Sequence, residues 1–486
     1  MEDSNLFHIL KTLSSDEMKD FGRFVDSPFH NRRREVTDFF DLVKKYHPDF
    51  INRNLTDEKL FGKLYPGKKY DDRVVRRISS FLMKVLENYL AYSRFKNDKY
   101  KFNKTLLEEI GSRNLPGIYE RKLKSLMKDF SEFVPPSEEY FLKRYYIIED
   151  KINNYLYKKR DIGLIKDLED HSLNLVEFLL VLMFQNKYNL YLYEVEFQAD
   201  YSSSVFNSLF EQIDPVKLIN LLKEKDSENY PYVAIYYYEL MSILNPEDES
   251  NISNFKKLLN EHIESFDWLE KRNFYYILVS ACTLMLEKGA MKYKSELLDA
   301  YEKMLDHGIY SDYEGGHFSA KLFRNIVAAA SLAEEYDWLE RFIDKYSCEL
   351  SESERNNIFN LSMALLNFAR GEYGKTLESI MNVNIELVQF KIDVRYLTVK
   401  TFYELNYYEQ LLSSIDAFRH FLYSDKFISE RVADVYTNFC NLAGRLAKMK
   451  YDDNTDNLPI IIKEIEQLEN KATSEWLMKK AKELVK

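Results

Sequence analysis

Four basic residues share one face of a segment that we expect to be helical, and they are the first candidates for chemistry. Arg73, Arg77 and Lys84 follow one another at helical spacings of four and seven, with Arg76 beside them. Cationic side chains on one helix face can neutralise the phosphates of a nucleic acid. An ordinary solvated helix face has the same pattern, and no recognition-helix motif decides between the two. We refer to Arg73, Arg76, Arg77 and Lys84 as the basic face.

Linear catalytic and metal-binding motifs are missing from the chain. It contains no GxxxxGK[ST] phosphate loop, no GxGxxG, no GxSxG nucleophile elbow and no HExxH or CxxC zinc signature. The segment from Asp452 to Asn457 begins like a calcium loop, but Asn457 stands where such a loop needs glycine and Lys463 where it needs glutamate. We therefore expect no catalytic residues, no metal and no cofactor. An active site assembled from distant residues would leave no linear motif.

The composition predicts an all-α fold. With 486 residues the chain is too long for one compact core, so we expect several units or an extended solenoid. Only 13 glycines and 10 prolines leave few turns, which suits long helices joined by short loops. The 37 tyrosines and 33 phenylalanines supply far more buriable surface than a disordered chain carries.

Cysteine usage and hydropathy indicate a cytoplasmic protein with no membrane segment. Cys282, Cys348 and Cys440 are far apart and odd in number, which fits a reducing compartment. The N-terminus has no apolar region of the kind that a signal peptide contains. The longest apolar run without tyrosine, 178–184, has seven residues, whereas a membrane span needs about 20.

Charge divides the chain unevenly. The net charge is −11, but residues 1–135 hold 27 basic against 21 acidic side chains, so this part carries +6 and the remainder −17. Such asymmetry is typical of a module that faces a partner or a nucleic acid, and Pro135-Pro136 is the strongest boundary signal. The predicted domains are a basic helical N-terminal domain over 1–135, a middle region of helical hairpins over 136–320, tetratricopeptide-like repeats over 321–450 and a capping helix over 459–486.

Local signals predict several helices of the first domain. Ser14 and Glu17 form a capping box. Further helices are expected over 33–46, from Thr56 onward, over 71–95 and over 118–132. The stripe of the 71–95 helix is formed by Val74, Ile78, Leu82, Val85, Tyr89 and Tyr92. Beyond the first domain, residues 188–197 partly alternate between polar and apolar, as in a strand, but their surroundings favour a helix.

Aromatic residues recur at a fixed interval in the C-terminal third. Trp338, Tyr373 and Tyr408 are 35 residues apart, and each separates two segments of helix length. Gly371 and Tyr373, with Ala364 seven residues before the glycine, form a Gly-x-Tyr turn. This pattern resembles the tetratricopeptide repeat (TPR), whose helix–turn–helix unit is about 34 residues long.

The resemblance covers residues 321–425 and is degenerate. Tyr336 and Asn406 stand where the turn glycine is expected in the flanking units. The wider chain also resembles a family of bacterial helical proteins that brings no known activity with it. The segments that carry this second resemblance are LSSDEMKDFGRFVDSPFHN, FRNIVAAASLAEEYDWLERFIDKY and YELNYYEQLL.

The resemblance to the TPR implies a concave groove lined by the first helix of each unit. In the third unit it turns Tyr396, Lys400 and Tyr403 inward, and tyrosines beside a cation suit a bound peptide. Tyrosines at helical spacing are also typical of a core. We therefore expect a non-catalytic protein–protein interaction scaffold or adaptor. The alternatives are a regulator that contacts nucleic acid through residues 1–135 and an enzyme without a linear motif.

Overall fold

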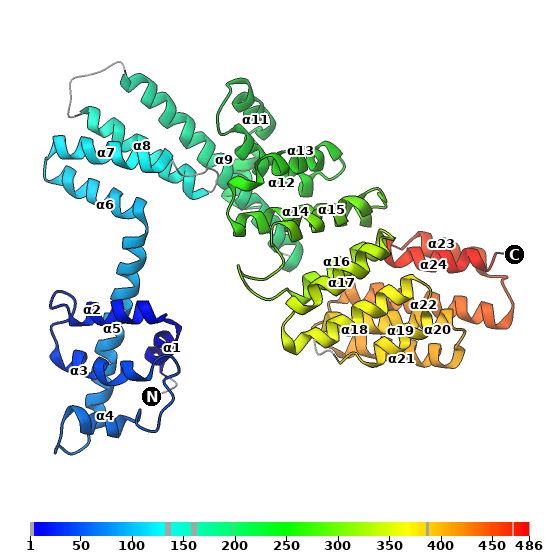
Figure 1. Ribbon diagram of the computed structural model, residues 1–486. Coiled ribbons are helices and arrows are strands. Elements are labelled where there is room, and N and C mark those ends of the chain that lie inside the picture. Colours follow the sequence, from blue (N-terminus) through cyan, green and yellow to red (C-terminus); the bar gives the residue numbers. More distant parts are fainter. Residues whose placement is uncertain are drawn as a thin grey trace. The chain divides into compact units, whose positions relative to one another are not determined.

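The computed structural model describes residues 4–131, 138–156, 163–197, 199–384, 388–468 and 471–485. These residues form helices joined by short loops (Figure 1), which confirms the predicted all-α fold. Within them the only β-type pairing is two isolated bridges, both of which involve Phe318. The boundary predicted at Pro135-Pro136 lies outside the described residues.

The chain divides into two compact units, each described here by itself. Unit 1 comprises Met1–Phe133 with Ile147–Leu168, and unit 2 comprises Val134–Tyr146 with Glu169–Lys486. Two helices, α8 (Glu138–Leu156) and α9 (Gly163–Phe197), contribute to both units. Residues 188–197 are part of α9, so the expectation of a helix there is confirmed.

Unit 1 begins with helices whose ends follow the predicted signals. The helix over 33–46 is α3 followed by the 3-10 turn η1, and the helix after Thr56 is α4, in which the Thr56 hydroxyl accepts a hydrogen bond from the Lys59 N–H. The elements are α1 (Asn5–Thr12), α2 (Ser15–Asp26), α3 (Arg34–Val43), η1 (Lys44–Tyr46), α4 (Asp57–Leu64), α5 (Asp72–Asn97), α6 (Lys99–Ser112) and α7 (Pro116–Ser131).

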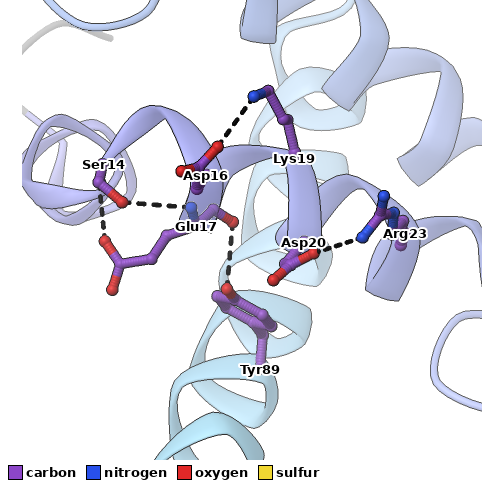
Figure 2. Close-up of polar contacts among 7 residues, drawn as sticks. All are labelled: Ser14, Asp16, Glu17, Lys19, Asp20, Arg23 and Tyr89. Atoms are coloured by element: carbon purple, nitrogen blue, oxygen red, sulfur yellow. Dashed lines mark hydrogen bonds and ion pairs between the residues drawn. The ribbon is translucent and has the colours of Figure 1, made fainter.

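The capping box at the start of α2 is confirmed (Figure 2). The Ser14 hydroxyl accepts from the Glu17 N–H at 3.2 Å, and the Glu17 carboxylate accepts from the Ser14 N–H at 2.7 Å. Asp16 and Lys19 form an ion pair in the same turn. The Tyr89 hydroxyl of α5 donates to the backbone carbonyl of Glu17 at 3.1 Å. This last bond joins α2 to α5 and fixes their relative register.

Helix α5 supplies the long apolar face on which α1 to α4 pack. Its stripe is shifted slightly from the prediction, because Val75 and Leu86 are buried while Tyr92 is 43% exposed. Val75 lies three residues before Ile78, and Leu86 lies four residues after Leu82, so both face the same side of the helix as these two central residues. The buried residues of α5 are Val75, Ile78, Leu82, Val85, Leu86 and Tyr89.

Unit 2 is a succession of helices, most of which pack against their neighbour in sequence as hairpins. Its elements after α9 are α10 (Val205–Gln212), α11 (Pro215–Glu224), α12 (Tyr230–Leu244), α13 (Glu249–His262), η2 (Ile263–Ser265), α14 (Trp268–Glu287), α15 (Tyr293–Asp306), α16 (Ala320–Leu332), α17 (Tyr336–Tyr346), η3 (Ser347–Glu349), α18 (Glu352–Ala369), α19 (Tyr373–Met381), α20 (Val388–Glu404), α21 (Tyr408–Ser424), α22 (Glu430–Asp452), α23 (Leu458–Glu466) and α24 (Lys471–Glu483).

Three successive hairpins, α16/α17, α18/α19 and α20/α21, share one turn. In each, a single residue adopts a left-handed conformation: Glu334 with φ 63°, Gly371 with φ 78° and Asn406 with φ 59°. The backbone N–H of the residue that follows the left-handed residue donates to the carbonyl five positions before it, as in the Schellman motif. These bonds run from Glu335 to Ala330, from Glu372 to Asn367 and from Tyr407 to Phe402.

The turn of the first hairpin corrects the predicted register. Tyr336 was expected in the position of the turn glycine, but Glu334 takes the left-handed conformation and Tyr336 is the first residue of α17. A bulky aromatic residue is poorly tolerated at positive φ. Trp338 is therefore the third residue of its helix, whereas Tyr373 and Tyr408 are first in theirs. The equal spacing of the three aromatics concealed this offset.

The end of the chain packs against the last hairpin. The range 459–486, expected as one capping helix, holds most of α23 and all of α24. Trp476 and Leu477 are buried, and Leu484 packs against the same cluster as a partly buried residue. This cluster joins α24 to α20, α21 and α22.

Candidate functional site

The three residues predicted to line the repeat groove meet inside a cluster of side chains. Tyr403 is 3% exposed, and its ring lies edge-on to Trp476 of α24 with centroids 5.1 Å apart. The Lys400 ammonium lies 4.5 Å from the Phe368 ring centroid and 5.0 Å from that of Tyr396. The structure thus brings Tyr396, Lys400 and Tyr403 together, but Trp476 occupies this face of α20.

Lys400 is a partly buried cation held by ring faces. Burial lowers the pKa of Lys400 to about 8, although the nearby carboxylates of Glu404 and Glu475 act in the opposite direction. The Glu404 carboxylate accepts hydrogen bonds from the Trp476 indole N–H and the Lys480 ammonium, both at 2.9 Å. The Glu404 carboxylate is therefore already shared by two other donors. The Lys400 ammonium relies on cation–π contacts with the surrounding rings.

The basic face lies on α5 with all four side chains exposed. Arg76 pairs at 2.6 Å with the aspartate four residues before it, and Arg77 lies 3.6 Å from the Glu35 carboxylate of α3. Arg73 and Lys84 form no ion pair with any residue that the structure describes. Half of the basic face is thus neutralised by the chain's own carboxylates, and two cations remain free.

Helix α9 is fixed against α12 by polar and apolar contacts. The fully buried Glu177 accepts hydrogen bonds from the Ser227 hydroxyl and, at 2.7 Å, from the Asn229 amide. Burial raises the pKa of Glu177, and these two donors oppose the rise. Phe184 packs edge-on to Tyr237 with centroids 5.6 Å apart. These contacts hold this part of α9 against α12 and the loop before it.

A pocket of about 600 Å³ lies between α9, α12 and α14. Tyr236, Glu239, Phe274 and Ile277 are its buried residues. Asn189 and Asn273 stand on its exposed rim. The sequence did not predict this pocket, because its lining residues are up to 95 positions apart, from Leu182 to Ile277. We refer to it as the α9/α12/α14 pocket.

Glu239 is the distinctive group of this pocket. It is the only acidic residue of α12, it is 7% exposed, and it forms no hydrogen bond or ion pair with the described residues through its carboxyl group. Burial raises the pKa of Glu239 to about 8. A buried carboxyl group without a partner is costly to the fold, and such groups concentrate at functional sites. One signal was visible in the sequence: a lone glutamate inside the apolar segment YVAIYYYELMSIL.

The second carboxyl group of the pocket, Glu270, already has partners. Its oxygens accept from the Asp267 N–H at 3.3 Å, within a capping box, and from the Tyr236 hydroxyl at 3.4 Å. Burial and the neighbouring Asp267 charge raise the pKa of Glu270 to about 7, against the opposing effect of these hydrogen bonds. Glu270 therefore stabilises the start of α14, which leaves Glu239 to face an occupant.

Apolar side chains are exposed along α9, α10 and α11. The clearest are Val205, 86% exposed, and Leu209, 55% exposed, which lie one turn apart on α10. Large exposed apolar areas on a folded protein mark interaction sites. The sequence signal was a short helix, VFNSLFEQ, with apolar residues on more than one face. We use the name α9–α11 surface for the exposed apolar residues of these three helices, which are Leu175, Val176, Leu179, Leu192, Val195, Val205, Leu209, Val216 and Leu221.

Comparison with known proteins returned no relative. No protein-family profile, curated protein or solved structure matches the chain significantly. Among the described helices, none combines the length and the apolar character that crossing a bilayer requires. Within the same residues, no three His, Cys, Asp or Glu side chains are grouped to hold a metal ion. The class is therefore defined by the fold and surfaces: an all-α protein of consecutive helical hairpins with an exposed apolar surface and a carboxyl-bearing pocket.

Proposed function

We propose that this protein is a non-catalytic protein–protein interaction adaptor whose C-terminal hairpins form a TPR-like solenoid. The observation that carries the proposal is the α9–α11 surface, on which Val205 is 86% exposed and Leu209 is 55% exposed. Covering such side chains is favourable by about 25 cal/mol per Å² of apolar area. A partner protein with a complementary apolar face supplies that cover.

The repeated turn supports the solenoid part of the proposal. Glu334, Gly371 and Asn406 end their helices with the same backbone geometry, and stacked hairpins of this kind present extended binding surfaces. The three free cysteines, of which Cys282 and Cys440 are buried, support a cytoplasmic location, since a reducing compartment keeps thiols free.

The experiment that tests the adaptor proposal is affinity capture of the full-length protein from a lysate of its native cells, with and without nuclease treatment, read by mass spectrometry. The test variant is Val205→Asp with Leu209→Asp. The matched control is Ile51→Asp with Met381→Asp, because those two apolar side chains are 76% and 84% exposed elsewhere. Substitutions at such exposed positions change stability by about 0.5 kcal/mol or less.

The proposal predicts protein partners that bind the wild type and the control variant but not the test variant, with or without nuclease. Two results contradict it. One is a set of partners that the test variant retains in full. The other is recovery that disappears with nuclease and with Arg73→Glu plus Lys84→Glu, which would assign the binding to nucleic acid at the basic face.

A further inference from the structure

We infer that the α9/α12/α14 pocket receives an arginine side chain of the partner protein, with the Glu239 carboxylate as the ligand of its guanidinium group. This inference rests on the proposed function, and it names the chemical group that the adaptor recognises at one point of contact with its partner. It starts from an unusual combination: a carboxyl group that is 7% exposed, lines an open pocket and has no hydrogen-bonding partner among the described residues.

Charge complementarity selects a cation as the occupant. Among the described residues, none donates a hydrogen bond to either carboxyl oxygen of Glu239, and a guanidinium presents two parallel N–H groups that match a carboxylate. The pocket offers no cation of its own, since none of the residues that line it is a lysine or an arginine. The occupant itself must therefore carry the positive charge that pairs with Glu239.

The other pocket walls favour arginine over lysine. Tyr188 and Tyr236 line the pocket, and a planar guanidinium stacks on aromatic rings and is more weakly hydrated than an ammonium. The amide groups of Gln185, Asn189 and Asn273 also line it. Their carbonyl oxygens can accept the N–H groups that Glu239 leaves free, because arginine has five donors in a fixed plane. Lysine has only three donors on a strongly hydrated centre.

The protonation of Glu239 gives the interaction a pH dependence. The titratable groups that line the pocket with Glu239 are Tyr188 from α9, Tyr236 on its own helix, and Glu270 and Tyr276 from α14. None of them is cationic, so burial holds the pKa of Glu239 at about 8 in the empty pocket. An arginine side chain binds the ionised form and displaces the proton. Affinity should therefore rise by up to about tenfold per pH unit between pH 6 and pH 8.

The test uses the full-length protein and a short probe, acetyl-Gly-Arg-Gly-amide, with binding measured by ligand-observed NMR at pH 6, 7 and 8. Comparison probes carry citrulline, the neutral isostere, or lysine in place of arginine, and spermidine represents free polyamines. The variants are Glu239→Gln, which keeps the shape, and Asn189→Trp, which narrows the exposed rim. Glu261→Gln, at an exposed position on α13, is the matched control.

The inference predicts that the arginine probe binds more tightly as the pH rises and that the citrulline probe does not bind. Glu239→Gln weakens binding of the arginine probe at least about tenfold, as expected for loss of a charged partner. Asn189→Trp weakens it by obstructing the rim, and Glu261→Gln leaves it unchanged. Equal binding by Glu239→Gln and wild type overturns the inference, and so does preference for lysine or spermidine.

The two proposals fail separately. Val205→Asp with Leu209→Asp leaves the α9/α12/α14 pocket intact and should retain the arginine probe. Suppose that this variant loses its protein partners while Glu239→Gln retains them. The adaptor proposal is then supported, and the arginine pocket is not one of its contact points. If the arginine probe binds but partner capture does not depend on the α9–α11 surface, the arginine pocket stands and the adaptor proposal fails.

Discussion

Ionisation of Glu239 should make the stability of unit 2 fall as the pH rises. The pKa of Glu239 is raised from 4.5 to about 8 by burial. Between these values the folded protein holds a proton that the unfolded chain has released, so increasing pH lowers the free energy of unfolding in this window. Multiplying the pKa difference by about 1.4 kcal/mol per unit gives a loss of at most about 5 kcal/mol by pH 8. Below pH 4.5 and above pH 8, the contribution is constant.

Substitution of Glu239 by glutamine removes the titration while keeping the shape of the side chain. The measurement is urea-induced unfolding followed by circular dichroism at pH values from 5 to 9, for the wild type and Glu239→Gln. The difference in unfolding free energy between the two proteins isolates Glu239, since all other groups titrate in both. The variant should become progressively more stable relative to the wild type up to pH 8, and Glu261→Gln should not. Parallel pH curves for the wild type and Glu239→Gln would refute the reasoning.

Two further predictions concern the repeats. Lys400→Met should stabilise the protein at pH 7, by at most about 3 kcal/mol, because burial lowers the pKa of Lys400 to about 8. The wild type should gain stability between pH 8 and the ordinary lysine pKa, whereas the methionine variant should not, as thermal unfolding at pH 7 and pH 10 would reveal. Glu334→Gly should raise the unfolding free energy by about 0.5–1 kcal/mol, since Glu334 has φ 63° and glycine adopts this conformation without a steric cost. Asn406→Gly should change it less, because asparagine tolerates that region, and an equal gain at both positions would contradict the strain argument.

Local signals in the sequence predicted the elements whose causes are local. The Ser14–Glu17 capping box, the Thr56 cap and the turn at Gly371 each depend on residues within one turn of the chain, and each is found in the structure. Scarce glycine and proline likewise predicted the all-α fold. The register of the first hairpin was wrong because aromatic spacing does not reveal which residue takes positive φ. Glu334, an ordinary surface residue in composition, carries no such signal.

Contacts between distant segments could not be predicted. The predicted groove residues, Tyr396, Lys400 and Tyr403, were placed on the inner side of the repeats, but only the structure shows Trp476 against them. The α9/α12/α14 pocket depends in the same way on three helices that periodicity cannot bring together. Glu239 was visible as a lone carboxylate in an apolar helix, yet its lack of a partner is a property of its neighbours.

The most direct test of the adaptor account is a hydrogen–deuterium exchange footprint of the protein with a partner that it captures. The account predicts slower exchange on binding across 175–195 and 205–224, which carry the α9–α11 surface. It predicts no change across 396–424. The account would be contradicted if exchange across 175–224 did not change, protection appeared instead across 72–97, and that protection was lost after nuclease treatment.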